Sequence, residues 1–276
     1  MRWIPDWLVY GLVVGALVLA LFRIDTRHNA PPTAPDAPRE GQLLPPPSMY
    51  DPQILVDVGP VSSGLGTAFA ISADGWWLTA RHVVDECQKV GVIVARGAAV
   101  EVKERRIAQF ADLALLRTDR APAALALNAD DHRLEIGQTA FHIGFPQGRS
   151  GEAASRLIGR ETLVAHGRYA LTEPVLAWAE IGRTGGLSGT LAGMSGGPAL
   201  ASDGRVIGVT VAESTRRGRI YTASLSSIQR LLRLEHVTPA GAPAPRLTPQ
   251  NYGEEADDLR RGLAVAQIVC IAGRTL

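Results

Sequence analysis

The region between two proline-rich stretches is divided into short apolar runs bounded by glycine and other turn-forming residues. This spacing favours β-structure over a helix bundle and is typical of barrels or sandwiches. A hairpin turn is expected at 73–75, and the serines and helical spacing of 224–234 predict a closing helix. The expected strands are 53–58, 67–72, 76–79, 90–95, 99–102, 113–117, 139–143, 161–165, 175–180, 199–200, 206–211 and 220–223.

The pattern divides the chain of 276 residues into four parts. Residues 1–27 contain an apolar segment, and 28–52 form a proline-rich linker, which we expect to be extended. Residues 53–235 form the compact block, a size that fits one large or two small domains. Residues 236–276 comprise a second proline-rich linker and a tail that begins helically and ends in an apolar strand at 263–271.

The N-terminal part contains the unbroken apolar run 7–22. A membrane-spanning helix needs about 20 apolar residues, a length that the run reaches if Trp3 and Ile4 join it. We therefore expect a retained single-span anchor, and a cleaved signal peptide is the alternative, although no good A-x-A cleavage site follows. A buried core helix is disfavoured because the run is apolar on all sides. The flanking arginines leave its orientation close to a tie.

The charge and cysteine content argue against nucleic-acid binding and against a metal site. The formal net charge is +1, so nothing global indicates a nucleic-acid partner. The two cysteines, Cys87 and Cys270, form no CxxC pair, and no Cys/His cluster has zinc-ligand spacing. We expect neither a metal nor another cofactor.

Three segments carry reactive residues in a fixed order. The first is TAFAI at 67–71, followed by LTARHVV with His82; the second is ADLALL with Asp112; the third is GMSGGP with Ser195. Each alone has an ordinary structural explanation, such as a packed histidine or a tight glycine turn. Together, a base, an acid and a serine in a sharp turn indicate nucleophilic catalysis.

These segments resemble the trypsin-like serine proteases, and are most similar to bacterial HtrA/Deg-like proteases and relatives that lack PDZ domains. The resemblance covers about residues 53–235 and implies an all-β fold of two antiparallel six-stranded β-barrels. It implies a catalytic triad of His82, Asp112 and Ser195, with the backbone N–H groups of Gly193 and Ser195 as the oxyanion hole. It further implies polypeptide substrates.

The resemblance also places the substrate cleft. Its expected lining consists of Gly189, Thr210, Val211, Ala212 and Glu213. The resemblance places Gly189 at the bottom of the S1 pocket, where no acidic side chain is present to pair with a basic P1 residue. We therefore expect small or medium apolar P1 residues, with the acid Glu213 near the rim of the pocket. Val211 occupies a position where relatives often carry Ser or Thr. Met194 replaces the Asp that, in pancreatic-type proteases, pairs with the new N-terminus formed by zymogen cleavage, so we do not expect that activation mechanism here. The forty or so residues after the helix are too few for an ordinary PDZ domain.

The cysteines and the anchor bear on location. If the apolar tail strand docks near His82, Cys87 and Cys270 come within reach of a disulfide; two separate buried thiols are the alternative. A disulfide implies an oxidising compartment. We therefore expect an inner-membrane protein with a single span and a periplasmic protease domain.

The expected function is peptide-bond hydrolysis through a covalent acyl-enzyme. The alternative is a protease-like binding module at the membrane with weak turnover, which the departures at Met194 and Val211 leave open.

Overall fold

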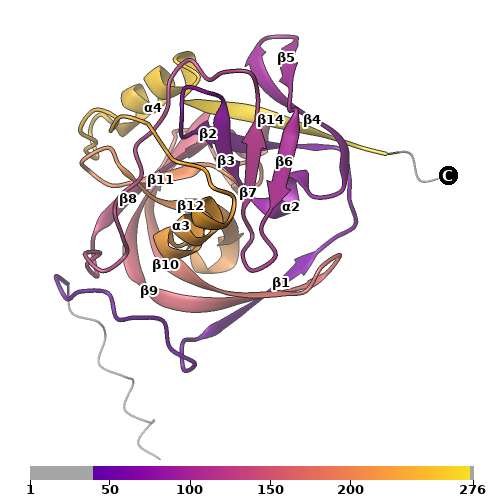
Figure 1. Ribbon diagram of the computed structural model, residues 1–276. Coiled ribbons are helices and arrows are strands. Elements are labelled where there is room, and N and C mark those ends of the chain that lie inside the picture. The colour runs from indigo at the N-terminus through magenta and orange to yellow at the C-terminus, as the bar shows by residue number, and fades with distance from the viewer. Residues whose placement is uncertain (1–39, 274–276) are drawn as a thin grey trace, which may run out of the picture. The chain divides into compact units, whose positions relative to one another are not determined.

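The computed structural model describes residues 40–273, which form two curled β-sheets of seven strands each (Figure 1). The predicted mostly-β fold is confirmed. No helix among the described residues is long and apolar enough to cross a membrane. The predicted anchor at 1–27 lies outside the described residues.

The first sheet collects the N-terminal half of the compact block. Its order is β5-β4-β14-β2-β3-β7-β6. The apolar strands β2 and β3 are joined by the expected hairpin, where Gly75 adopts φ +90° and its N–H donates to the Ser72 carbonyl. The strands are β2 (Gly64–Ala70), β3 (Trp76–Thr79), β4 (Cys87–Ala95), β5 (Ala98–Glu101), β6 (Glu104–Ile107), β7 (Ala114–Arg117) and β14 (Val265–Ala272).

The second sheet contains a closed ring of six strands. Strand β8 pairs with both β9 and β11, and the ring continues through β10, β13 and β12. This part matches the predicted six-stranded antiparallel barrel. The ring strands are β8 (Thr139–Gly144), β9 (Gly151–Gly167), β10 (Leu171–Arg183), β11 (Pro198–Leu200), β12 (Val206–Ser214) and β13 (Arg219–Ala223).

Two strands depart from the expected pair of six-stranded antiparallel barrels. Strand β1 (Gln53–Val58) joins the second sheet in parallel with β9, not antiparallel. The long β9 pairs with β8 only over 151–156, so its edge over 162–167 is free for β1. In the first sheet β14 is a seventh strand, inserted between β4 and β2.

The tail therefore completes the first sheet instead of standing apart from residues 53–235. Helix α4 (Tyr252–Arg261) leads into β14. The second proline-rich stretch is hydrogen-bonded to the body of the protein through the N–H groups of Ala240, Ala242 and Ala244. Part of the first linker also packs, because the N–H groups of Gly41 and Leu44 donate to the 134–136 segment.

The predicted closing helix is present as α3 (Leu225–Leu234), capped by the Ser224 hydroxyl, which accepts from the Ser227 N–H. Large apolar side chains fill the core beneath it and between the sheets. Those that are fully buried include Phe69, Trp77, Phe141, Trp178 and Tyr221. Burial of such side chains is the main stabilising contribution to a fold of this kind.

A covalent link joins two neighbouring strands of the first sheet, β4 and β14. Cys87 begins β4, Cys270 lies in β14, and a disulfide joins them with a Cα–Cα distance of 5.5 Å. Both side chains are buried. The bond closes a loop spanning a sequence separation of 183 residues. It therefore connects the C-terminal strand to the segment that follows His82.

Replacing Cys270 with Ala should lower the free energy of unfolding by up to about 5 kcal/mol, because a loop of this length restricts the unfolded chain strongly. Urea denaturation of wild type and C270A measures the difference. The C87A/C270A double variant and reduced wild type should behave like C270A, since all three lack only the bond. A loss below about 1 kcal/mol would show that the bond contributes little.

Candidate functional site

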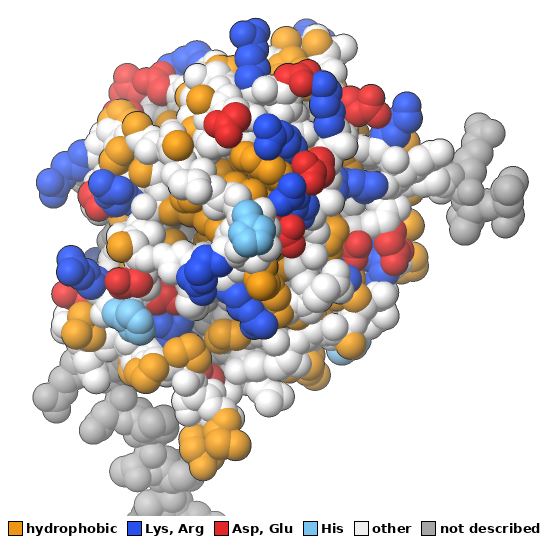
Figure 2. All heavy atoms as spheres, in the orientation of Figure 1, with side chains coloured by type: hydrophobic (Ala, Val, Ile, Leu, Met, Phe, Trp, Pro, Cys, Tyr) orange, Lys and Arg blue, Asp and Glu red, His pale blue; other side chains and the backbone are white. Residues whose placement is uncertain are grey.

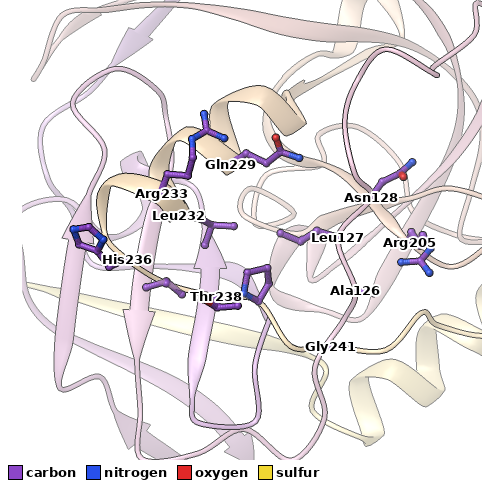
Figure 3. A pocket seen from close by; sticks show the side chains of 12 residues that line it. Ala126, Leu127, Asn128, Arg205, Gln229, Leu232, Arg233, His236, Thr238 and Gly241 are labelled. Atoms are coloured by element: carbon purple, nitrogen blue, oxygen red, sulfur yellow. The ribbon is translucent and has the colours of Figure 1, made fainter.

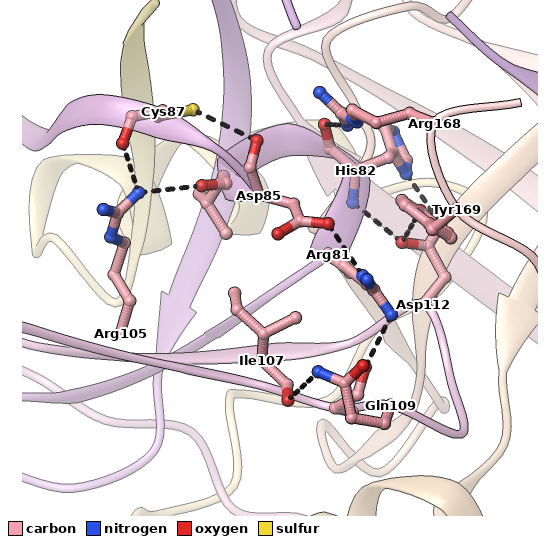
Figure 4. Close-up of polar contacts among 12 residues, drawn as sticks. Arg81, His82, Asp85, Cys87, Arg105, Ile107, Gln109, Asp112, Arg168 and Tyr169 are labelled. Atoms are coloured by element: carbon pink, nitrogen blue, oxygen red, sulfur yellow. Dashed lines mark hydrogen bonds and ion pairs between the residues drawn. The ribbon is translucent and has the colours of Figure 1, made fainter. Parts of the chain in front are cut away.

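His82 and Asp112 are brought together by the ends of two paired strands. His82 lies in the short helix α2 (Arg81–Val84), which directly follows β3, and Asp112 lies just before β7. Because β3 and β7 pair, these loops are adjacent. The His82 Nδ1 atom lies 2.7 Å from Asp112 Oδ2, and the His82 backbone N–H donates to Oδ1 at 2.9 Å (Figure 4).

The interaction between His82 and Asp112 raises the pKa of the imidazole and lowers the pKa of the carboxyl group. Burial lowers the pKa of His82, but the charge of Asp112 and its hydrogen bond outweigh burial and hold the pKa above 6.5. Burial raises the pKa of Asp112, yet His82 and the hydrogen bonds to the carboxylate hold it below its usual value. Asp112 is thus a carboxylate around neutral pH and orients the ring through Nδ1.

The loop that carries Ser195 packs against the first sheet beside this pair. The Thr67 N–H donates to the Ser195 carbonyl at 2.9 Å. Gly196 adopts φ +88°, and a Cβ there would overlap the Thr67 carbonyl and the Thr79 hydroxyl. The loop therefore contacts the end of β3, one residue before α2. Within residues 40–273, no hydrogen bond joins the Ser195 hydroxyl to His82.

Two amides of this loop have no partner among the described residues. The N–H groups of Met194, Gly196 and Gly197 donate to carbonyls, whereas those of Gly193 and Ser195 make no hydrogen bond within 40–273. Gly193 adopts φ +97°, and its Cβ would meet the Phe145 carbonyl. Backbone N–H groups without a protein partner are suited to binding an anionic oxygen.

The Thr67 side chain also bonds the loop that carries Ser195. Its hydroxyl donates to the Gly193 carbonyl at 2.7 Å and accepts from the Phe145 N–H at 3.1 Å. The Gln147 N–H donates to the Ala192 carbonyl at 2.6 Å. In a trans peptide the C=O and N–H point in opposite directions. Because the Ala192 carbonyl is bonded to Gln147, the Gly193 N–H of the same peptide unit points away from that contact.

A groove of about 570 Å³ contains His82 and Asp112. Of the predicted cleft residues, Val211, Ala212 and Glu213 line it, whereas Gly189 and Thr210 do not. The carboxylate of Glu213 accepts from the Leu191 N–H at 2.8 Å and from the Thr190 hydroxyl. This acid is therefore already bonded to the protein. The Gly189 carbonyl accepts from Arg183.

Part of strand β1 also lines the groove, although the sequence analysis did not assign this strand to the site. Residues 55–62 line the groove, and the Leu55 side chain is 72% exposed. The sequence predicts this strand but contains no signal for its pairing partner, because parallel pairing with β9 spans more than a hundred residues. A local pattern cannot report a contact of that range.

The loop between β9 and β10 adds residues that the sequence analysis did not single out. The Tyr169 hydroxyl donates to Asp112 Oδ1 at 3.1 Å, and Arg168 donates to the His82 carbonyl at 2.9 Å (Figure 4). The Arg81 guanidinium stacks 3.9 Å from the centroid of the Tyr169 ring. Val211 is buried and apolar, so Tyr169 provides a bond to Asp112 that Val211 cannot.

A larger groove of about 890 Å³ lies beside α3, away from these residues (Figure 3). Polar side chains on its wall include Asn128, Arg205, Gln229, Arg233 and His236. It contains none of the predicted catalytic residues. On the face seen in Figure 2, charges of both signs are interspersed among apolar side chains. No set of three potential metal ligands is clustered in the described part of the chain.

Two curled β-sheets that carry a His–Asp pair and a glycine-rich serine loop are the arrangement expected for the trypsin-like fold. The family model of the trypsin-like peptidase domain matches residues 66–209, more than half of the chain. The chain therefore belongs to this family, as its motifs predict.

Curated relatives are similar over the same region. The probable periplasmic serine endoprotease DegP-like of Brucella suis is 29% identical over 155 residues, covering 55% of this chain and 28% of the relative. The protein of the same description from Pseudomonas putida is 26% identical over 157 residues, covering 57% and 31%. The chain thus spans less than a third of the length of either relative.

Among solved structures, the active form of the Rv3671c protease from M. tuberculosis superposes with a TM-score of 0.52. It is 22% identical, and the match covers 64% of this chain and 76% of that one. This likeness concerns the fold.

The His82 imidazole should titrate above pH 6.5 in a histidine NMR titration, because Asp112 stabilises its charged form. In Asp112→Asn the pKa should fall, since burial then acts without the opposing charge. The fully buried His142 is an internal reference: burial lowers its pKa to about 3, so it should stay neutral throughout. An unchanged His82 pKa in D112N would contradict this electrostatic account.

Proposed function

We propose that this protein is a serine endopeptidase with His82, Asp112 and Ser195 as its catalytic triad. The observation that carries the proposal is the His82–Asp112 pair, joined at 2.7 Å beside a serine loop with two unbonded amides. Membership of the trypsin-like peptidase family supports the same chemistry. The family further supports polypeptides as the substrates.

The proposed reaction follows from these positions. Ser195 Oγ attacks the scissile carbonyl while His82 Nε2 takes its proton, and His82 then protonates the leaving amine. Asp112 keeps the proton of the resting imidazole on Nδ1 and stabilises the imidazolium. The amides of Gly193 and Ser195 bind the developing oxyanion. Water then attacks the acyl-enzyme by the same route, so no cofactor is needed.

The alternative function is a protease-like binding module with weak turnover. The absence of a Ser195–His82 hydrogen bond within residues 40–273 favours it. Such bonds are often long without substrate and shorten in the Michaelis complex. We therefore retain the peptidase as the main proposal, and turnover distinguishes the two functions.

Replacing Ser195 with Ala should abolish peptide cleavage and labelling by a fluorophosphonate probe, because both require the Ser195 oxygen. Casein or peptide hydrolysis and probe labelling of purified full-length protein measure these effects. Ser202→Ala is the matched control, since the Ser202 side chain lies outside the proposed site. Equal turnover in wild type and S195A would refute the triad, whereas labelling without turnover would favour the binding module.

We propose that substrate lies extended along Val211–Glu213, with β1 as the second wall of the groove. Strand β12 pairs with β11 only as far as Val209, and the backbone of Thr210 is bonded to Gly196 and Gly197. Among the described residues, no strand pairs with that edge of β12 from Val211 onward, which leaves it open to a substrate strand. Gly189 and Thr210 remain proposed contributors to the specificity pocket, although they do not line this groove. Glu213 is bonded to Thr190 and Leu191.

A peptide library should give small or medium apolar residues at P1, because no free acid stands at Gly189 to pair with a basic side chain. Mass spectrometry of the cleavage products identifies the P1 residue. Glu213→Gln removes the negative charge that lines the groove and should leave the P1 preference apolar. A profile dominated by Arg or Lys in wild type, lost in E213Q, would show that Glu213 reads P1 directly.

We also propose that the protease acts on the periplasmic side of the inner membrane, held by a span within 1–27 and a linker over 28–52. The apolar run 7–22 supports the span. The Cys87–Cys270 disulfide supports an oxidising compartment. Relatives described as periplasmic support the same location.

A further inference from the structure

Asp112 is held from the second sheet by two residues four positions apart. The Tyr169 hydroxyl donates to Asp112 Oδ1, and the Asp112 backbone N–H donates to Glu173 Oε1 at 2.7 Å. Glu173 lies near the start of β10, whereas Asp112 lies in the loop before β7 of the first sheet. The contact thus fixes the position of Asp112 across the junction of the two sheets.

The Glu173 carboxyl group is in a poor environment for a charge. The residue is only 1% exposed, and Oε2 has no hydrogen-bond partner among the described residues. Burial and the nearby negative charge of Asp112 together raise the pKa of Glu173 to about 8, against one opposing bond from the Asp112 N–H. At neutral pH the group is therefore a carboxylic acid, with its carbonyl oxygen accepting from Asp112.

Within residues 40–273, no surrounding charged group supplies a cation to Glu173. Arg81 of α2 pairs with Asp85 at 2.9 Å and donates to the Ala108 carbonyl. Arg168, in the loop before Tyr169, donates to the His82 carbonyl. Burial and the Asp112 charge raise the pKa of Tyr169 well above its usual value, so it remains protonated. Asp112, paired with His82, is the charged group that acts on Glu173.

We propose that Glu173 is a positioning residue that supports Asp112 only while it is a neutral acid, so that loss of its proton disables the His82–Asp112 pair. This inference rests on the proposed peptidase function. When Glu173 ionises, two carboxylates share a buried site without an added cation, and their repulsion displaces Asp112 from His82. Catalysis then declines as the pH rises through the ionisation of Glu173.

The test is the pH profile of kcat/KM for wild type, Glu173→Gln and Tyr169→Phe. Glutamine keeps the carbonyl acceptor for the Asp112 N–H but cannot ionise. The wild-type profile should fall above about pH 8. In E173Q this alkaline limb should move upward by about one pH unit or more, with activity at pH 7 within about threefold of wild type.

Tyr169→Phe is the matched control, because it removes one hydrogen bond to Asp112 without changing a charge near neutral pH. It should lower kcat by about tenfold and leave the alkaline limb where it is in wild type. Thermal unfolding of each variant verifies that the comparison is made between folded proteins.

An E173Q profile identical to that of wild type would overturn the inference while leaving the peptidase intact. A folded but inactive E173Q would also overturn the inference, because activity would then require the negative charge of an ionised Glu173. Lack of Ser195-dependent turnover in wild type would instead refute the proposed function. If E173Q does not fold, ¹³C NMR of the glutamate carboxyls in S195A still decides: one should titrate near pH 8, and none doing so would overturn the inference.

Discussion

The arrangement of the site depends on one buried carboxylate, Asp112, which lies at the junction of the two sheets. A charge in such a place is unfavourable unless nearly all of its oxygen lone pairs are bonded. Here the backbone and ring of His82 and the hydroxyl of Tyr169 provide those bonds. Because these donors come from α2 and from the β9–β10 loop, satisfying the carboxylate also aligns the first sheet with the second.

The loop that carries Ser195 is positioned by its backbone conformation and by backbone hydrogen bonds, not by a buried charge. Gly193 and Gly196 adopt positive φ values that other residues reach only with strain, and Gly196 allows the loop to contact the Thr67 backbone closely. The Thr67 side chain bonds the Gly193 carbonyl, and the Thr67 N–H bonds the Ser195 carbonyl. The Gly193 and Ser195 amides share peptide units with the Ala192 and Met194 carbonyls, which accept hydrogen bonds from other backbone N–H groups. The two amides themselves make no hydrogen bond among the described residues, and such preorganised donors are what electrostatic catalysis requires.

The sequence predicted the parts of the site that depend on local context. The segments around His82, Asp112 and Ser195 each encode a strand end or a tight turn, and their order indicated a trypsin-like peptidase. The supports at Tyr169 and Glu173 could not be predicted, because each acts through a contact of more than fifty residues in sequence. The strand count was also wrong, because β1 and β14 join sheets through long-range pairing that periodicity does not encode.

The C-terminal strand β14 connects the strand that supports the serine loop with the strand that follows the His82 segment. Strand β14 pairs with β2 such that Gln267 lies opposite Thr67, the residue that holds the serine loop. On its other edge it pairs with β4, whose first residue, Cys87, is bonded to Cys270 and follows α2 closely. Without β14, β2 and β4 would each lose a partner along one edge, and their backbone groups would be left unpaired. The tail is therefore part of the scaffold that supports both the His82 segment and the serine loop, although it lies beyond both of them in the sequence.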